Sequence, residues 1–182
     1  MAPSDPSDSG WLEGWQKGDQ ASAEPSGEPT GRDRREAERL MAYWQQKLEE
    51  LGGHCTIAGL ELQKADSNEW SNRFLISVDP IVERSSLLLY GPRFAKLLGL
   101  SEKPRTDLPL LRVVPRRYAT VFLRGCAEAH KEWSPVRLEG EVERADGRIE
   151  QYRVVFIPVG VKPNALTCFA FGAFNSRIVE PQ

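Results

Sequence analysis

The stretch EGEVERADGRIEQYRVVFIPV, residues 139–159, holds two segments of alternating apolar and polar residues on either side of Asp146-Gly147. A period of two is typical of strands that bury one face, and an Asp-Gly pair is a common hairpin turn. This stretch therefore predicts an antiparallel hairpin, and its register decides which side chains share the buried face.

The length of the turn sets that register. A two-residue turn at 146–147 would place apolar side chains opposite polar ones. A three-residue loop over 145–147, with Gly147 in the left-handed region, instead sets Glu139 opposite Arg153. We therefore predict the bulged loop, which gives one apolar face: Val136, Leu138, Gly140, Val142, Tyr152, Val154 and Phe156.

Three further segments are predicted strands. Residues 73–79 (RFLISVD) and 85–90 (SSLLLY) flank a turn at Asp79-Pro80. Residues 166–175 (LTCFAFGAFN) are apolar at nearly every position. Because a strand that is apolar on both faces must be covered on both, this last segment belongs in the middle of a sheet.

Helical periodicity marks residues 33–51, a short segment within 91–100, and residues 116–132 after Pro115; the stretch between the last two is expected to be irregular. Asp33 is the expected cap of the first helix, and Gly52-Gly53 ends it. Its apolar stripe must be covered either by its own domain or by a second protomer, and both alternatives remain open. The stripe consists of Leu40, Trp44, Leu48 and Leu51.

The first 32 residues differ from the rest in composition. They hold 14 Pro, Gly and Ser residues and six acids against two cations. Such a segment buries too little apolar surface to offset its ordering entropy. We expect a disordered acidic tail at 1–32, a helix at 33–53 and one domain at 54–182. In the tail, Trp11 and Trp15 form either a docking motif or indoles that rest loosely on the body.

The composition excludes several classes of protein. With 182 residues, 40% of them hydrophobic, and a net charge of −2, the chain reads as one globular domain without a nucleic-acid or membrane partner. The odd number of cysteines, and the lack of a signal peptide or a span of about 20 apolar residues, favour the cytoplasm. Neither a phosphate loop nor a hydrolase or metalloprotease motif occurs, so we expect no enzyme, no catalytic residue and no metal site.

The order of the predicted elements resembles that of the PAS domain family over roughly residues 70–179. The resemblance rests on FLISVD (74–79), SSLLLYGPRFAKLLGLS (85–101) and the large hairpin at 139–159. It departs from the family after Asp79, where no glycine turn follows, and at 90–92, where an Asn is common. The resemblance implies an α+β fold: a five-stranded antiparallel sheet in the order 2-1-5-4-3, helices on one face, and an N-terminal amphipathic helix that often mediates dimerisation.

The same resemblance implies a non-catalytic sensory or signalling module, typical of stand-alone bacterial single-PAS proteins. We expect it to signal in trans, as a homodimer through the 33–51 stripe or through a protein partner that docks on the stripe or on the tail. A small ligand is expected between the sheet and its covering helices. The residues expected to bind it are Tyr118, Phe122, Cys126, Gly140, Tyr152 and Phe156. The alternative is a constitutive protein–protein adaptor whose PAS fold is fully packed.

No cofactor is required by this sequence. Flavin-binding relatives carry an N-C-R-F-L-Q-like motif that is missing here, so Cys126 reads as a small core residue. His130 lies close to where haem-binding relatives place their iron ligand, which makes a haem sensor a third hypothesis. Near a helix end, however, this histidine is better explained as a surface or capping residue, and His54 is better explained as an exposed loop residue.

Overall fold

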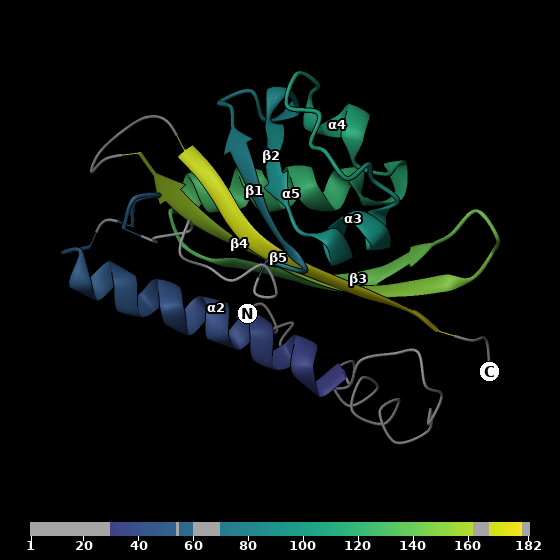
Figure 1. The fold of residues 1–182 in the computed structure, drawn as a ribbon, viewed down its shortest axis with the longest axis horizontal. Helices are drawn as coiled ribbons and strands as arrows, with labels where there is room; N and C mark the ends of the chain where they lie inside the picture. Colours follow the sequence, from purple (N-terminus) through teal and green to yellow (C-terminus); the bar gives the residue numbers. More distant parts are fainter. Residues whose placement is uncertain (1–29, 54, 60–69, 162–167, 180–182) are drawn as a thin grey trace, which may run out of the picture.

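The structure, a computed structural model, describes residues 30–53, 55–59, 70–161 and 168–179, with side chains from Ala37 onward. Trp11, Trp15, His54 and most of the acidic tail therefore lie outside the described residues. Figure 1 shows one twisted sheet with helices on both sides. Its strands are β1 (Arg73–Val78), β2 (Ser86–Tyr90), β3 (Val136–Glu143), β4 (Ile149–Gly160) and β5 (Cys168–Val179).

The strand order is β2-β1-β5-β4-β3, and every pairing is antiparallel. This order confirms the prediction made from the PAS resemblance. It also places β5 in the centre of the sheet, as its apolar residues on both faces predicted. The helical elements are α2 (Thr30–Glu50), η2 (Val82–Arg84), α3 (Pro92–Leu98), α4 (Leu110–Val113) and α5 (Arg116–Glu132).

The predicted register of the large hairpin is confirmed. Glu139 lies opposite Arg153, and Gly140 lies opposite Tyr152. The loop turns through Gly147, whose φ of 79° is in the left-handed region where a side chain would be strained. The backbone N–H of Arg144 donates to the carbonyl of Arg148 at 2.9 Å and closes the three-residue loop.

Helices α3, α4 and α5 cover one face of the sheet, which we call the inner face, and α2 crosses the opposite, outer face (Figure 1). On the outer face, Leu40 and Trp44 of α2 are buried against apolar side chains of the sheet. Leu48 packs at the edge of this second core, whereas Leu51 is 39% exposed. The first half of the predicted stripe is therefore covered by the chain's own sheet. The sheet residues of this core are Leu75, Val155, Ile157, Val159, Phe171 and Ala173.

Several boundaries differ from the sequence prediction. Helix α2 begins at Thr30, so Asp33 lies inside the helix instead of capping it. The turn after Asp79 contains the short helix η2, and the stretch expected to be irregular contains α4. Leu110 of α4 is fully buried, and its backbone N–H donates to the carbonyl of Ser85 at 2.6 Å.

Strand β5 continues beyond the predicted end of 175. It reaches Val179 because β4 offers pairing partners over its whole length, ending with Ile149 opposite Val179. The polar residues Ser176 and Arg177 concealed this extension, since they interrupt the apolar run that marked the strand.

Candidate functional site

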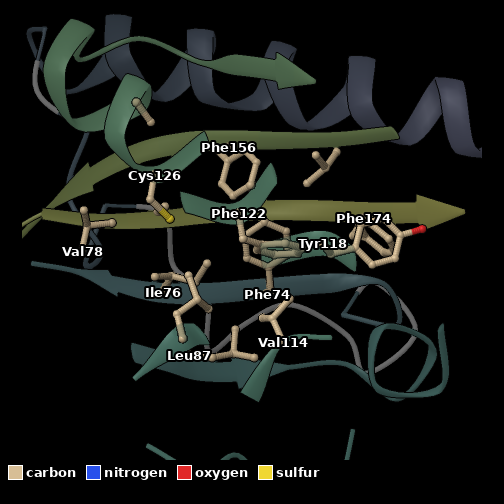
Figure 2. Close-up of a cluster of buried hydrophobic side chains, with 14 of the residues drawn as sticks. Phe74, Ile76, Val78, Leu87, Val114, Tyr118, Phe122, Cys126, Phe156 and Phe174 are labelled. Atoms are coloured by element: carbon tan, nitrogen blue, oxygen red, sulfur yellow. The ribbon is translucent and has the colours of Figure 1, made fainter. Parts of the chain in front are cut away.

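A continuous cluster of aromatic rings fills the inner core. All of its rings are fully buried, and their centroids are 5.0 to 6.0 Å apart. Such offset and edge-on contacts stabilise a core beyond the burial of apolar area. Figure 2 shows that strands and helix α5 bring the rings together, with Tyr118 beside Phe174 at one end and Cys126 toward the other. The cluster consists of Phe74, Phe94, Tyr118, Phe122, Phe156 and Phe174.

The residues predicted to bind a ligand come together around this cluster. Tyr118 and Phe122 project from α5 because they recur at helical spacing, and they meet side chains of β4. The centroids of Tyr118 and Tyr152 are 5.5 Å apart, and those of Phe122 and Phe156 are 5.6 Å apart. The structure thus places the predicted ligand residues in one region, and their role in binding stays a prediction.

Gly140 provides space that the neighbouring strand uses. A Cβ atom added at Gly140 would lie 2.9 Å from the hydroxyl oxygen of Tyr152, the residue opposite it. The half-buried Tyr152 side chain therefore occupies the space left by the missing side chain. This packing is what the alternative of a fully packed PAS fold predicts at this position.

Cys126 is a buried core residue on α5. Burial raises the pKa of its thiol far above the ordinary range, and the nearby Cys168 raises it further. Cys55, Cys126 and Cys168 are all free and buried. A thiolate is needed for reactivity, so this environment makes Cys126 unreactive.

Glu150 is a charged residue of the inner face that the sequence analysis missed. It is only 2% exposed, and the hydroxyl of Ser176 donates to its carboxylate at 2.6 Å. Arg117 of α5 and Arg144 beside the hairpin loop each donate to the same carboxylate at 3.2 Å. This cluster therefore ties α5, the hairpin and β5 together at one end of the aromatic core.

The strand pattern could have identified Glu150. Alternation places it on the same face as Tyr152, Val154 and Phe156, which were predicted to be buried. It is, however, the second residue of β4, close to the hairpin loop, where charged side chains are commonly exposed. A buried carboxylate requires paired donors, and only the tertiary structure shows that Arg117 supplies one of them.

The hydroxyl of Tyr118 lies beside this cluster. It is fully buried and close to Glu150 and Ser176. It nevertheless forms no hydrogen bond of acceptable geometry with any described residue. Burial and the Glu150 charge raise the pKa of this phenol well above its usual range, which keeps it neutral and able to donate a hydrogen bond. The Arg117 guanidinium lies 5.1 Å from the centroid of the Tyr118 ring.

His130 lies in the last turn of α5, away from the polar cluster. Its ring is half-buried, and its Nδ1 atom is buried without a partner among the described residues. A haem macrocycle between α5 and the sheet would have to replace the packed rings of Phe122 and Phe156. The residues present therefore do not fit a haem at this site.

The parts of the chain that the structure describes hold no group of three His, Cys, Asp or Glu side chains positioned to bind a metal ion. In the same residues, no helix combines the length and the apolar character needed to cross a bilayer.

Comparisons with known proteins give structural neighbours only. No family model matches this sequence, and no curated protein matches it. The match to the PAS domain of a protein from Colwellia psychrerythraea has 13% identity and a TM-score of 0.44, and covers 65% of this chain and 98% of that one.

Two further matches are to LOV proteins. The Rhodobacter sphaeroides LOV protein has 14% identity and a TM-score of 0.38, over 79% of this chain and 67% of that one. A variant of RsLOV has 20% identity and a TM-score of 0.40; the match covers 58% of this chain and only 61% of that chain's length.

The architecture itself decides the type of fold. The strand order β2-β1-β5-β4-β3, the all-antiparallel pairing and the covering of one face by helices were all implied by the PAS resemblance. The described part of the chain therefore has a PAS-like fold.

Proposed function

We propose that this chain is a non-catalytic, cytoplasmic sensory signalling module whose PAS-type domain binds a small ligand at the Tyr118 end of its inner core. The observation that carries this proposal is the buried, unpartnered Tyr118 hydroxyl beside the buried Glu150 carboxylate. Buried polar groups are nearly always hydrogen-bonded, so a hydroxyl without a partner requires an explanation. A ligand that supplies the missing partner provides one.

The surroundings define the chemistry of this ligand. Its polar end would pair with the Tyr118 hydroxyl and with the Glu150 carboxylate, which favours a group that both donates and accepts hydrogen bonds. Its apolar body would take the place of the Tyr152 ring, which is half-buried and packs edge-on against Tyr118. Movement of Tyr152 away from Gly140 would open the path from the surface.

The central strands offer a route by which such a ligand would act on α2. In β4, Phe156 belongs to the inner core, whereas its neighbours Val155 and Ile157 belong to the outer core beneath α2. A displacement of β4 on ligand binding would thus change the surface on which Trp44 packs. The signal would then pass in trans, to a second protomer or to a protein partner that contacts α2.

Native mass spectrometry of the full chain, together with thermal unfolding against a metabolite panel, tests the proposal. We expect a retained small molecule, or a ligand that raises the melting temperature; at 100 times its Kd, a ligand stabilises by about 2.7 kcal/mol. In Tyr118→Phe the ligand-dependent shift should be lost while the fold is kept. A clean polypeptide mass and no shift with any compound would contradict ligand sensing.

One observation favours the adaptor as a second candidate. The rings of the inner core contact one another continuously, and Tyr152 already occupies the space at Gly140. In this hypothesis the packed domain binds only protein. It predicts that no metabolite stabilises the chain and that capture of its partner is unaffected by Tyr118→Phe.

Dimerisation through α2 is a separate element of the proposal. Since Leu40 and Trp44 are buried on the chain's own sheet, the contact would use the end of the helix, where Leu51 is exposed. Leu51→Glu together with Leu48→Glu should give a monomer by light scattering. An unchanged assembly mass in this variant would show that any dimer forms elsewhere.

A further inference from the structure

Two arginines are held side by side at the polar end of the inner core. The Nε atom of Arg117 and the Nη1 atom of Arg144 each lie 3.2 Å from the same carboxylate oxygen of Glu150. The other oxygen of Glu150 accepts a hydrogen bond from the hydroxyl of Ser176 at 2.6 Å. Because Glu150 is buried and both of its oxygens are engaged, its carboxylate fixes the positions of the two guanidinium groups.

This cluster carries more positive charge than Glu150 neutralises. Arg117 and Arg144 bring two positive charges to a single carboxylate. Asp146 lies 3.6 Å from the Nε atom of Arg144, but it is already paired with Arg148 at 2.7 Å. One positive charge is therefore in excess, and an anion between the two guanidinium groups would relieve their repulsion.

Both arginines have hydrogen-bond donors that the described residues do not use. A guanidinium carries N–H donors on all three of its nitrogens, and Arg117 uses only its Nε atom in the described part of the chain. The buried Nε atom of Arg144 has no hydrogen-bond partner there. The two side chains are 27% and 30% exposed, so a molecule from the solvent can reach them.

The first turn of α5 adds to the positive potential. Its N-cap residue, Pro115, makes no side-chain hydrogen bond to the helix, and the turn contains no acid. The positive end of the helix dipole is thus left to attract an anion. Arg117 lies in this turn, next to Tyr118, whose buried hydroxyl has no partner among the described residues. The basic groups and this hydroxyl therefore belong to one site.

We propose that Arg117 and Arg144 together bind one carboxylate group, so that the ligand of the Tyr118 site is a small monocarboxylate with an apolar body. This inference rests on the proposed function, because the apolar body would take the place of the Tyr152 ring. Both oxygens of a carboxylate accept hydrogen bonds from guanidinium groups, and its single charge matches the excess in the cluster. A phosphate dianion would bring surplus negative charge close to Glu150.

Mandelate and phenylglycol test the charge of the ligand. Mandelate carries a phenyl ring, a hydroxyl and a carboxylate on one carbon, and phenylglycol has a hydroxymethyl group in place of the carboxylate. NMR titration of the full chain at constant ionic strength, followed at the arginine Nε–Hε resonances, compares their affinities. We expect saturable shifts at Arg117 and Arg144 with mandelate, and binding at least about 10-fold weaker with phenylglycol, which lacks the charge-assisted hydrogen bonds. Equal affinities would overturn this inference and leave ligand sensing at Tyr118 in place.

Acetate separates the arginine site from the ligand pocket. It has the carboxylate but almost no apolar body, so it should shift the same resonances with lower affinity than mandelate. If acetate and mandelate bind equally well, the arginine site stands and the proposed pocket at Tyr118 fails. If neither anion shifts these resonances, the arginine site is overturned.

Substitutions assign the effect to the two arginines. Arg117→Gln should remove the preference for mandelate over phenylglycol, and Arg117→Lys, which keeps the charge, should retain part of it. Arg144→Gln is the second variant, since Glu150 then keeps Arg117 and Ser176 as partners. Lys131→Gln is the matched control, because it removes a positive charge from an 82% exposed side chain in the last turn of α5. An unchanged preference in both glutamine variants of the arginines, or an equal loss in Lys131→Gln, would contradict the proposal.

Discussion

Gly125 of α5 lies directly against the ring of Phe156 in β4, so closely that any side chain at position 125 would overlap the ring. Both residues are buried, and Phe156 is part of the aromatic cluster. The missing side chain thus sets how near the helix comes to the sheet. Helix α5 carries Tyr118 at the polar end of the core, so this approach also positions the candidate site.

Gly125→Ala is therefore expected to destabilise the domain. An added methyl group in a packed core costs about 1–3 kcal/mol, and the better helix propensity of alanine offsets about 1 kcal/mol of this. Urea unfolding measures the difference. Thr120→Ala, on the exposed side of the same helix, is the matched control, and equal stability of the two variants would show that the ring moves aside without cost.

Glu150→Gln tests the buried charge cluster. The amide keeps the shape of the side chain but leaves Arg117 and Arg144 without their shared carboxylate, which we expect to cost about 2–3 kcal/mol. Both arginines are partly exposed and regain water, so the loss stays below that of a fully buried pair. Chemical denaturation should show this loss for Glu150→Gln and almost none for Glu141→Gln, an exposed residue of β3. Equal stability of the two variants would contradict a structural role for the cluster.

Tyr118→Phe, in contrast, is expected to stabilise the domain in the absence of ligand. The hydroxyl is buried without a partner, and an unsatisfied polar group costs about 1–3 kcal/mol. Its removal should raise the stability by about 1 kcal/mol in thermal or urea unfolding. A clear loss of stability would mean that the hydroxyl is hydrogen-bonded in solution, for example to Glu150 or to a water molecule.

The hairpin loop and α5 could be predicted from the sequence because local chemistry determines them. Gly147 fixes the loop, and the alternation on either side of it gives the pairing of Glu139 with Arg153. In α5, the helical spacing of Tyr118, Phe122 and Cys126 gives the buried side. Each of these features lies within a short window of sequence.

The partners of the candidate site could not be predicted in the same way. Glu150 is stabilised by Arg117, 33 residues earlier, and by Ser176, 26 residues later, and no local pattern relates these positions. The amphipathic stripe of α2 likewise indicated that another surface must cover it, but the sequence did not show which surface this is. In the structure, Trp44 of the stripe packs against the outer face of the chain's own sheet.

The three thiols should be protected in the native protein. Burial raises the pKa of Cys55 and of Cys168 from 9.0 to about 11, and raises that of Cys126 further. At pH 8 this lowers the thiolate fraction of the first two about 100-fold. Reaction with a disulfide reagent should therefore be slow in buffer and rapid for all three thiols in urea. A fast-reacting thiol in the folded protein would contradict the described burial.

The hairpin loop contains a carboxylate that should titrate at low pH. The Arg148 side chain and backbone N–H donate to Asp146 and lower its pKa from 3.8 to about 2. Because the folded-state pKa lies below the unfolded value, any stability from this contact is complete above about pH 4 and is lost as the pH falls toward 2. NMR titration should show the low pKa, and Arg148→Gln should bring it back toward 3.8. A pKa near 3.8 in the unaltered chain would show that the contact is not formed in solution.

Strand β5 is buried on both sides, since the residues from Ala170 to Asn175 are all buried and alternate between the two cores. No position in this run offers a site where a charged side chain can point to water. Substitution is therefore restricted at six consecutive residues, whereas an ordinary half-exposed strand restricts every second one. When this chain diversifies, β5 should change most slowly, and changes at Phe171 and Phe174 should be accompanied by compensating changes on opposite sides of the sheet.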